Sequence, residues 1–281
     1  MRFTFLGTGT SAGIPMIGCH CAVCTSDDPR DRRLRASACV RFIDAGGHER
    51  VILLDAGPDL RQQALREKLQ RCDAILFTHN HVDHVFGLDE TRRFNAVQQS
   101  AIEIHADNNT MDSLERVYKH IFDKDRNVND SFVATLLRFR ISDDEVQSST
   151  PISLFGVNFL PIPLLHGRLP ILGWRIEPSG ALLTGAASDV FPLAYCTDVS
   201  AIPNDTWRRM KGLKTLVLDA LRHRSHPTHF TLANAIAAAE AIGAERTYFI
   251  HMAHDLPHAQ TQATLPENMF LAYDQLTLPE M

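Results

Sequence analysis

Several features are scarce or missing in this chain of 281 residues, and each excludes a class of protein. No apolar run approaches the roughly 18 residues that a membrane-spanning helix needs, so no membrane partner is expected. The first ten residues, MRFTFLGTGT, do not combine a charged leader with an apolar run, so no signal peptide is expected. Basic residues are not in excess, because the formal net charge is −5, which argues against a surface built mainly to hold nucleic acid.

Cysteine is also sparse, and six residues in a chain of this length are too few for a disulfide scaffold. We therefore expect a cytoplasmic protein, in which clustered cysteines indicate metal binding or catalysis more often than disulfides. Cys19, Cys21 and Cys24 form one cluster around His20. Three thiolates are one ligand short of a closed tetrahedral site, so the cluster alone leaves open a disulfide, a redox site, a zinc site and an ordinary loop. The remaining cysteines stand alone and are expected to be core thiols: Cys39, Cys72 and Cys196.

Apolar residues are plentiful, at 44%, and can form a sizeable core. Short apolar runs that predict strands alternate with helical patterns in both halves, which indicates an α/β layered protein. One such helix is TLANAIAAAEAIG, from Thr231 to the terminating Gly243. The segment 107–150 begins with an amphipathic helical pattern and continues into a polar stretch. We expect it to be a helical insertion, and a candidate lid, on a single domain covering 1–281.

The most informative stretch is FTHNHVDH, which follows an apolar strand and holds His79, His81, Asp83 and His84 within six residues. Imidazole and carboxylate ligands suit zinc, manganese or iron. The two pairs of ligands could serve two metals a few ångströms apart, an arrangement that activates water for hydrolysis. A solvated polar loop is the alternative, and the density of ligands argues against it.

This motif resembles that of the metallo-β-lactamase superfamily, and the remaining positions of the pattern are filled in order along the chain. LLDAG supplies Asp55, PLLHG supplies His166, AYCTD supplies Asp198 and YFIHMAH supplies His251. The resemblance implies a four-layer αββα sandwich, in which two β-sheets pack face to face with helices outside.

The resemblance also implies roles for these residues. His79, His81 and His166 would hold one divalent metal, while Asp83, His84 and His251 would hold the other. Asp198 would bridge both, together with a water or hydroxide. Asp55 would hydrogen-bond a ligand imidazole and fix its tautomer, or act as a structural turn residue. Zinc and manganese are the expected catalytic metals, and iron is also compatible with these ligands.

The start FLGTGTSAGIP looks like the start shared by the tRNase Z and PhnP-like phosphodiesterase branches, and C-x-C-x-x-C resembles the PhnP-like proteins. In those proteins a histidine three residues after the last catalytic metal ligand closes a structural zinc site. The corresponding residue here is His254. The resemblance therefore implies one structural zinc on Cys19, Cys21, Cys24 and His254, a normal Cys₃His set.

The same branch holds a histidine outside the metal set near the scissile phosphate. LDALRHRSHPTHFTL offers His223, His226 and His229, and His229 matches best because it directly precedes the helix that begins near Thr231. Asp219 could orient it. The predicted catalytic residues are thus His229, Asp83, Asp198 and Asp219. The implied activity is a metal-dependent phosphodiesterase that hydrolyses a small or cyclic phosphodiester by attack of the bridging hydroxide. A phosphoribosyl 1,2-cyclic phosphate is one candidate substrate.

Two other functions stay open at this point. A tRNase Z-like nuclease would share the metal site, but the net charge and the absence of a Gly/Pro-rich protruding arm disfavour it. The best basic patch, RDRRLR at 30–35, reads as a solvated face. A non-catalytic PqqB-like binding or carrier protein is disfavoured by the complete ligand set. The expected partners are a small phosphodiester and, if the protein is a homodimer, a second copy of the chain; nucleic acid is not expected.

Overall fold

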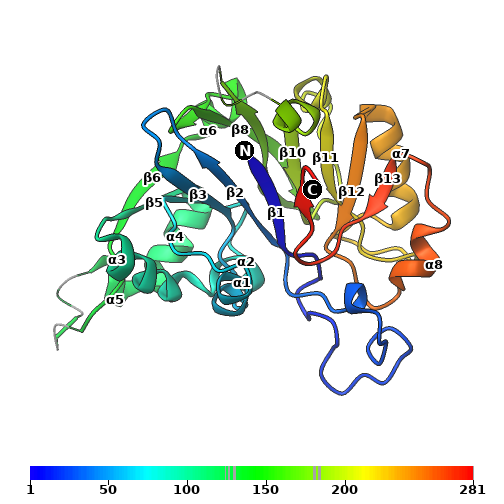
Figure 1. Ribbon diagram of the computed structural model, residues 1–281, viewed down its shortest axis with the longest axis horizontal. Helices are drawn as coiled ribbons and strands as arrows, with labels where there is room; N and C mark the ends of the chain where they lie inside the picture. Colours follow the sequence, from blue (N-terminus) through cyan, green and yellow to red (C-terminus); the bar gives the residue numbers. More distant parts are fainter. Residues whose placement is uncertain (124, 126, 129–130, 180–181, 183–184, 281) are drawn as a thin grey trace.

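Two seven-stranded β-sheets pack face to face in the computed structural model, which describes residues 1–123, 125, 127–128, 131–179, 182 and 185–280 (Figure 1). Helices cover the outer face of each sheet, which gives the four layers that the sequence predicts. The predicted αββα sandwich is confirmed.

The first sheet has the order β14-β1-β2-β3-β4-β5-β6. Strands β1 to β3 are antiparallel, and β3 to β6 are parallel. Strand β14 pairs with β1 at Phe3↔Leu278 and Thr4↔Thr277, so the two ends of the described chain lie in one sheet. The strands are β1 (Arg2–Gly7), β2 (Ser37–Ile43), β3 (Glu49–Leu54), β4 (Ala74–Leu76), β5 (Ile102–Asp107), β6 (Leu136–Ile141) and β14 (Thr277–Leu278). The covering helices are α1 (Leu60–Arg66), α2 (Val82–Val85), α3 (Arg92–Gln98), α4 (Asn108–Val117) and α5 (Lys119–Phe122).

The second sheet has the order β13-β12-β11-β10-β9-β8-β7, with β7 to β10 antiparallel and β10 to β13 parallel. Helices α7 (Leu232–Ile242) and α8 (His258–Gln262) lie outside it, and α6 (Asp143–Ser148) precedes β7. Short 3₁₀ helices are η1 (Pro29–Asp31), η2 (Leu88–Thr91), η5 (Gly185–Asp189) and η6 (Trp207–Met210). The strands are β7 (Ile152–Leu154), β8 (Val157–His166), β9 (Leu169–Pro178), β10 (Leu193–Cys196), β11 (Thr215–Asp219), β12 (Arg246–Ile250) and β13 (Met269–Leu271).

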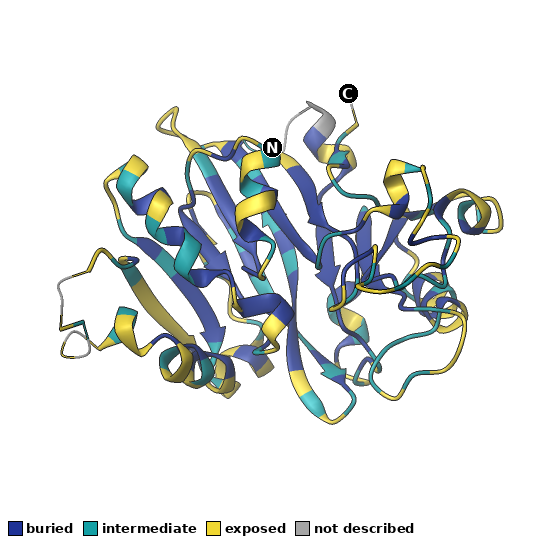
Figure 2. Cartoon of the chain, turned by 90° about the horizontal axis from the view of Figure 1, so that it is seen from below, coloured by how far each residue is buried: buried dark blue, intermediate teal, exposed yellow. Residues whose placement is uncertain are grey.

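Both faces of the central strands are buried, as the dark strands and yellow outer helix faces of Figure 2 show. In β3, Ile52 and Leu54 point into the layer between the sheets, while Val51 and Leu53 face the helices. Successive side chains alternate between the two faces of a strand, so a near-continuous apolar run is what such a strand requires. No helix within the described residues has the length and apolarity to cross a membrane.

The segment expected as a helical insertion, 107–150, is only partly separate from the sheet. It contains α4, α5 and α6, but β6 pairs in parallel with β5 from Ile102↔Leu136 to Asp107↔Ile141. The expected helical insertion therefore also contains a strand, which forms the edge of the first sheet. Residues 124, 126 and 129–130 of the segment lie outside the described residues. A role as a lid stays a prediction.

Candidate metal centre

Strand ends deliver the predicted ligands to one edge of the sandwich. The chain turns sharply as it leaves three strands, because Asp55 after β3, Asp198 after β10 and His251 after β12 have positive φ angles of 64°, 59° and 59°. Such angles are uncommon outside glycine, and strained residues of this kind cluster at functional sites. The remaining candidates follow β4, lie in α2 or end a strand: His79, His81, Asp83, His84, His166 and Asp219.

The predicted ligand sets come together in space. His79, His81 and His166 each place a ring nitrogen within 4.8 Å of the others. Asp83, His84, Asp198 and His251 form a second group on the same criterion. Asp198 also lies within that distance of His166, so it stands between the two groups, as the predicted bridging role requires.

Buried ring nitrogens that make no hydrogen bond, although Nε2 of His84 and Nε2 of His251 lie 3.2 and 3.1 Å from carboxylate oxygens of Asp198, indicate that these groups fit metal ions. Nε2 of His79, Nε2 of His84 and both ring nitrogens of His251 are buried and make no hydrogen bond within the described residues. A buried polar atom left in this way costs about 1–3 kcal/mol unless something binds it. Imidazole nitrogens that converge with carboxylates provide a donor set for divalent cations. The residues present therefore fit a pair of such ions.

Hydrogen bonds outside the two groups fix the orientation of the ligand rings. His84 donates through Nδ1 to Oδ2 of Asp55, at 2.7 Å, which is the contact expected of Asp55. Thr78 supports the same carboxylate, since its N–H donates to Oδ1 and its hydroxyl to Oδ2, each at 2.8 Å. His166 donates through Nδ1 to the carbonyl of Thr228 at 2.6 Å. In both histidines Nε2 is thereby left free as the metal-binding atom.

Carboxylates dominate the electrostatics of the second group. Burial disfavours the charged form of His251, but the carboxylates of Asp198, Asp83 and Asp219 outweigh it and raise the pKa of His251 to about 9. Burial likewise opposes a charge on His84, but the carboxylates of Asp198, Asp55 and Asp83 outweigh it and hold the pKa of His84 well above its ordinary value. In the metal-free protein, protons therefore occupy positions that cations would take, and metal binding would release them.

His229, the histidine predicted from the sequence to lie near the substrate, lies against this cluster. Its ring stacks on that of His251 with centroids 4.7 Å apart, and its Nδ1 donates to Oδ1 of Asp219 at 3.1 Å. Asp219 is anchored in turn by the N–H of Phe230, at 3.0 Å. Burial, and then the charge of His251, lower the pKa of His229 to about 3. His229 is thus a neutral imidazole near neutral pH. Of the other two candidates, His226 lies next to His229, with ring centroids 5.1 Å apart, and His223 is exposed.

The cysteine cluster lies in the dark-blue loop below the sandwich in Figure 1 and is complete in the predicted form. The Sγ atoms of Cys19, Cys21 and Cys24 lie 3.2, 3.4 and 3.6 Å from Nδ1 of His254. Zinc bonds of about 2.0–2.3 Å in a tetrahedron separate neighbouring ligand atoms by roughly 3.3–3.8 Å, so the group fits zinc. The N–H of Cys24 is the main cause that lowers the pKa of Cys21 to about 7, which favours the thiolate needed for binding.

Residues 50–252 match the family described as the Beta-lactamase superfamily domain. This chain belongs to the β-lactamase superfamily. Both the sandwich and the order of the candidate ligands agree with that membership.

Individual superfamily members resemble the chain to different degrees. A crystal structure of a new diphosphatase from the PhnP family is 40% identical, with a TM-score of 0.83 over 99% of this chain and 97% of that chain. The short form of human tRNase Z is 18% identical, with a TM-score of 0.68 over 99% of this chain and 98% of that chain, and shows the fold alone.

Among curated proteins, the octanoyltransferase of Porphyromonas gingivalis is 35% identical over 278 residues, which are 98% of this chain and 51% of that relative. The chain therefore spans about half the length of that relative. Coenzyme PQQ synthesis protein B of Methylobacterium nodulans is 26% identical over 234 residues, 78% of this chain and 72% of the relative.

Two supporting residues of this superfamily site had no place in the sequence prediction. Thr78 directly precedes His79, so the motif FTHNHVDH itself contained the signal. Thr228 acts through its backbone carbonyl, which any residue could supply, so no residue type marks it.

Proposed function

We propose that this chain is a metal-dependent phosphodiesterase that acts on a small phosphodiester. The observation that carries the proposal is the meeting of two ligand groups at Asp198, with the His229–Asp219 pair against them. The 40% identical relative is described as a diphosphatase, which supports a phosphorus-containing substrate.

Two divalent cations held by these groups would lower the pKa of a water molecule and offset negative charge on the phosphoryl oxygens. The protein's own contribution is positional. Asp55 and the Thr228 carbonyl hold His84 and His166 in the tautomer that points Nε2 inward. Asp219 fixes the ring of His229 through Nδ1, which leaves Nε2 of His229 for the substrate.

His229 is the proposed proton donor to the leaving oxygen. Its pKa of about 3 in the substrate-free protein leaves it neutral. The negative charge of a bound phosphodiester raises the pKa of a neighbouring imidazole, because it stabilises the imidazolium form. Substrate binding would thus bring His229 closer to the protonated state that a general acid needs.

A diphosphate ester is a second candidate substrate, and the description of the 40% identical relative favours it. In such a substrate the leaving group is a phosphate, which is a weaker base than an alkoxide and needs less help from a proton donor. The two substrates therefore differ in how far their hydrolysis depends on His229. An alkyl phosphodiesterase would lose much of its turnover in His229→Ala, whereas a diphosphatase would lose little.

The test is a panel of phosphorus esters assayed on protein loaded with zinc, manganese or iron, with metal-deficient Asp198→Ala as the control. The panel contains a phosphomonoester, an alkyl phosphodiester, a phosphoribosyl 1,2-cyclic phosphate, a diphosphate diester and a tRNA precursor. Turnover of a small diester by the native chain, and not by Asp198→Ala, supports the proposal. Preferred cleavage of the tRNA precursor would favour the nuclease. A chain that holds one metal, at the cysteines, and turns over nothing would favour the binding protein.

A further inference from the structure

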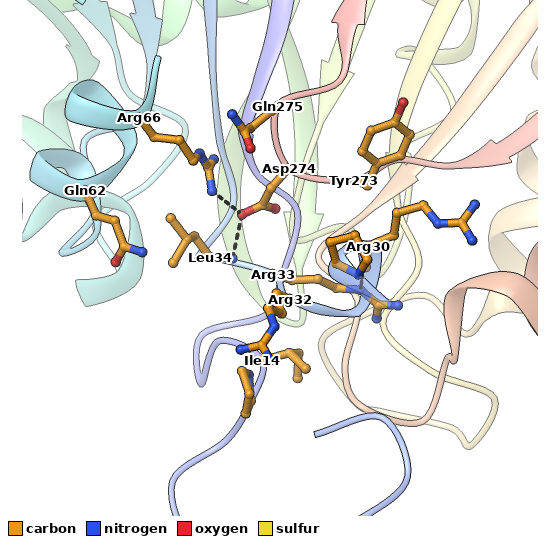
Figure 3. Close-up of a pocket in the computed structure, with 12 residues that line it drawn as sticks. Ile14, Arg30, Arg32, Arg33, Leu34, Gln62, Arg66, Tyr273, Asp274 and Gln275 are labelled. Atoms are coloured by element: carbon orange, nitrogen blue, oxygen red, sulfur yellow. Dashed lines mark hydrogen bonds and ion pairs between the residues drawn. The ribbon is translucent and has the colours of Figure 1, made fainter. Parts of the chain in front are cut away.

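A cavity of about 600 Å³ opens behind the end of β1, between η1, the helix α1 and the segment that follows β13 (Figure 3). None of its lining residues belongs to either metal-binding group or to the cysteine cluster. Arg66 and Gln62 approach it from α1 on one side, and Tyr273 lies on the other. We call it the arginine pocket, because four of its lining residues are arginines: Arg30, Arg32, Arg33 and Arg66.

Three of these arginines come from the RDRRLR run, for which the sequence predicts a solvated face. That prediction is wrong for Arg33, whose side chain has 0% exposure. Its guanidinium donates to the carbonyl of Leu256 at 2.6 Å, to the carbonyl of Ala253 at 3.0 Å and to Asp31 at 3.2 Å. Arg33 is therefore fully engaged and forms a wall of the pocket.

The other arginines of the run differ in what they contact. Arg30 pairs with Asp28 at 2.7 Å, and Arg35, which lies outside the pocket, pairs with Asp59 at 2.9 Å. Arg32 is exposed, and its guanidinium has no partner within the described residues. Arg32 is therefore a cation at the pocket without a counter-ion.

Positive charge exceeds negative charge in the lining. The one carboxylate among the lining residues is that of Asp274, and Arg66 pairs with it at 3.1 Å. Asp274 also accepts the N–H and hydroxyl of Thr8, at 3.0 and 2.8 Å, and the N–H of Leu34, at 2.9 Å. Arg66 also donates through Nη2 to the carbonyl of Leu6 at 2.5 Å, and its Nε lies 3.7 Å from Oε1 of Glu67. Arg66 is therefore held by the protein itself, and Arg32 is the cation left to attract an anion.

The remaining lining is suited to a neutral, planar group. The side-chain amides of Gln62 and Gln275 make no hydrogen bond within the part of the chain that the structure describes, so both can donate to a ligand. The ring of Tyr273 and the rings of Pro15 and Pro29 supply flat apolar surface. Aromatic and proline faces of this kind pack against planar rings.

We propose that the arginine pocket binds a small phosphomonoester with a planar apolar part, of the chemistry that a nucleoside monophosphate has. Arg32 contacts the phosphate, because its guanidinium fork matches the phosphate oxygens. Gln62 and Tyr273 contact the rest of the ligand. This site is separate from the proposed phosphodiesterase centre and does not depend on that activity.

The test is calorimetric titration of the metal-loaded protein with adenosine 5′-monophosphate, adenosine and inorganic phosphate. Arg32→Glu removes the proposed contact. Arg61→Glu is the matched control, since Arg61 is an exposed arginine of α1 outside the pocket and the charge change is equal. We expect adenosine 5′-monophosphate to bind at least about tenfold more weakly to Arg32→Glu and unchanged to Arg61→Glu. Adenosine should bind more weakly than its monophosphate, and turnover of a phosphodiester without added nucleotide should be equal in all three proteins.

Several results would overturn the proposal. Equal weakening in both variants would mean a general effect of charge, and equal affinity in all three proteins would place the nucleotide at the metal centre. Adenosine binding as tightly as its monophosphate, or no binding of the monophosphate at about 10 mM, would also refute it. Because Arg32 is exposed and its side chain is unpaired, Arg32→Glu should keep the native melting temperature, which separates lost binding from lost folding.

Discussion

Replacing Asp55 with asparagine should weaken metal binding more than it weakens the fold. The side chain is fully buried, and an amide has nearly the same size as the carboxylate. The amide oxygen can still accept from the N–H of Thr78, but the amide nitrogen would face Nδ1–H of His84. His84 can then keep a hydrogen bond at Nδ1 only by moving its proton to Nε2. That atom lies 3.2 Å from Oδ2 of Asp198 and is the predicted metal ligand, so the new tautomer would block it.

The hydrogen bonds that Asp55 accepts determine how much metal affinity and how much stability each variant should lose. Loss of a partner that orients a ligand histidine costs about 10–100-fold in metal affinity, or about 1.4–2.7 kcal/mol. Asp55→Ala goes further, because it leaves three donors without an acceptor: Thr78 N–H, Thr78 hydroxyl and His84 Nδ1–H. Removal of one partner from a buried charged pair costs about 3–5 kcal/mol. We therefore expect Asp55→Ala to lose stability on that scale and Asp55→Asn to lose mainly metal affinity.

The assay pairs metal affinity, from competition with a chelating indicator, with urea unfolding of the metal-free proteins. Ser37→Ala is a suitable control, since its hydroxyl donates to the backbone carbonyls of Leu54 and Asp55 and does not contact His84. That variant should lose about 1 kcal/mol of stability with unchanged metal affinity. A folded Asp55→Asn protein that binds both metals as tightly as the native chain would refute the tautomer argument.

Three further predictions concern the same centre. His229→Ala should lower turnover of an alkyl phosphodiester by about 10²–10⁴-fold at unchanged metal content, and unchanged turnover would remove His229 from the mechanism. Elemental analysis should show that Asp198→Ala lacks the metal pair and keeps the zinc at the cysteines. Cys21→Ser should lose the zinc at the cysteines before it loses the metal pair. Loss of all metals in both variants would mean that the sites are not independent. The stability of the metal-free protein should be greatest near pH 6.5 and should fall on either side of it. Burial lowers the pKa values of His229 and His258 to about 3 and 4, so the unfolded chain binds more protons and stability falls as the pH drops below about 6.5. The pKa of His251 is raised to about 9, so its contribution to stability is full below about pH 6.5 and is lost progressively as the pH rises from about 6.5 to 9. A urea midpoint that stayed constant from pH 6.5 to 4 would contradict the assignment of the low pKa values.

The candidate ligands could be predicted because their signal is local and ordered. Four of them lie within FTHNHVDH, and the others end apolar strands in a fixed sequence along the chain. The division into two groups, with Asp198 between them, is what the family resemblance implies, and the fold brings those groups together. The residues themselves therefore carried most of the information about the centre.

Features that depend on distant parts of the chain could not be predicted. The buried state of Arg33 depends on carbonyls of Ala253 and Leu256, more than two hundred residues away, so its arginine-rich neighbourhood suggested solvent instead. Strand β6 reads LLRFRI, and its arginines pair with residues of α4, so the pattern did not reveal that it extends a parallel sheet. In both cases the residues near the feature in the sequence do not indicate which distant segment it will contact.

The pairing of β1 with β14 has a consequence for synthesis of the protein. Strand β1 leaves the ribosome before the rest of the sandwich, and its neighbour at Thr277–Leu278 follows about 270 residues later, after roughly 15–55 s of translation at typical rates. One edge of the first sheet is exposed during that interval, and His251 and His254 also emerge late. Any metal that His251 or His254 holds can therefore be bound fully only after most of the sandwich has been made. Shielding of the open sheet edge until then would limit unwanted strand pairing.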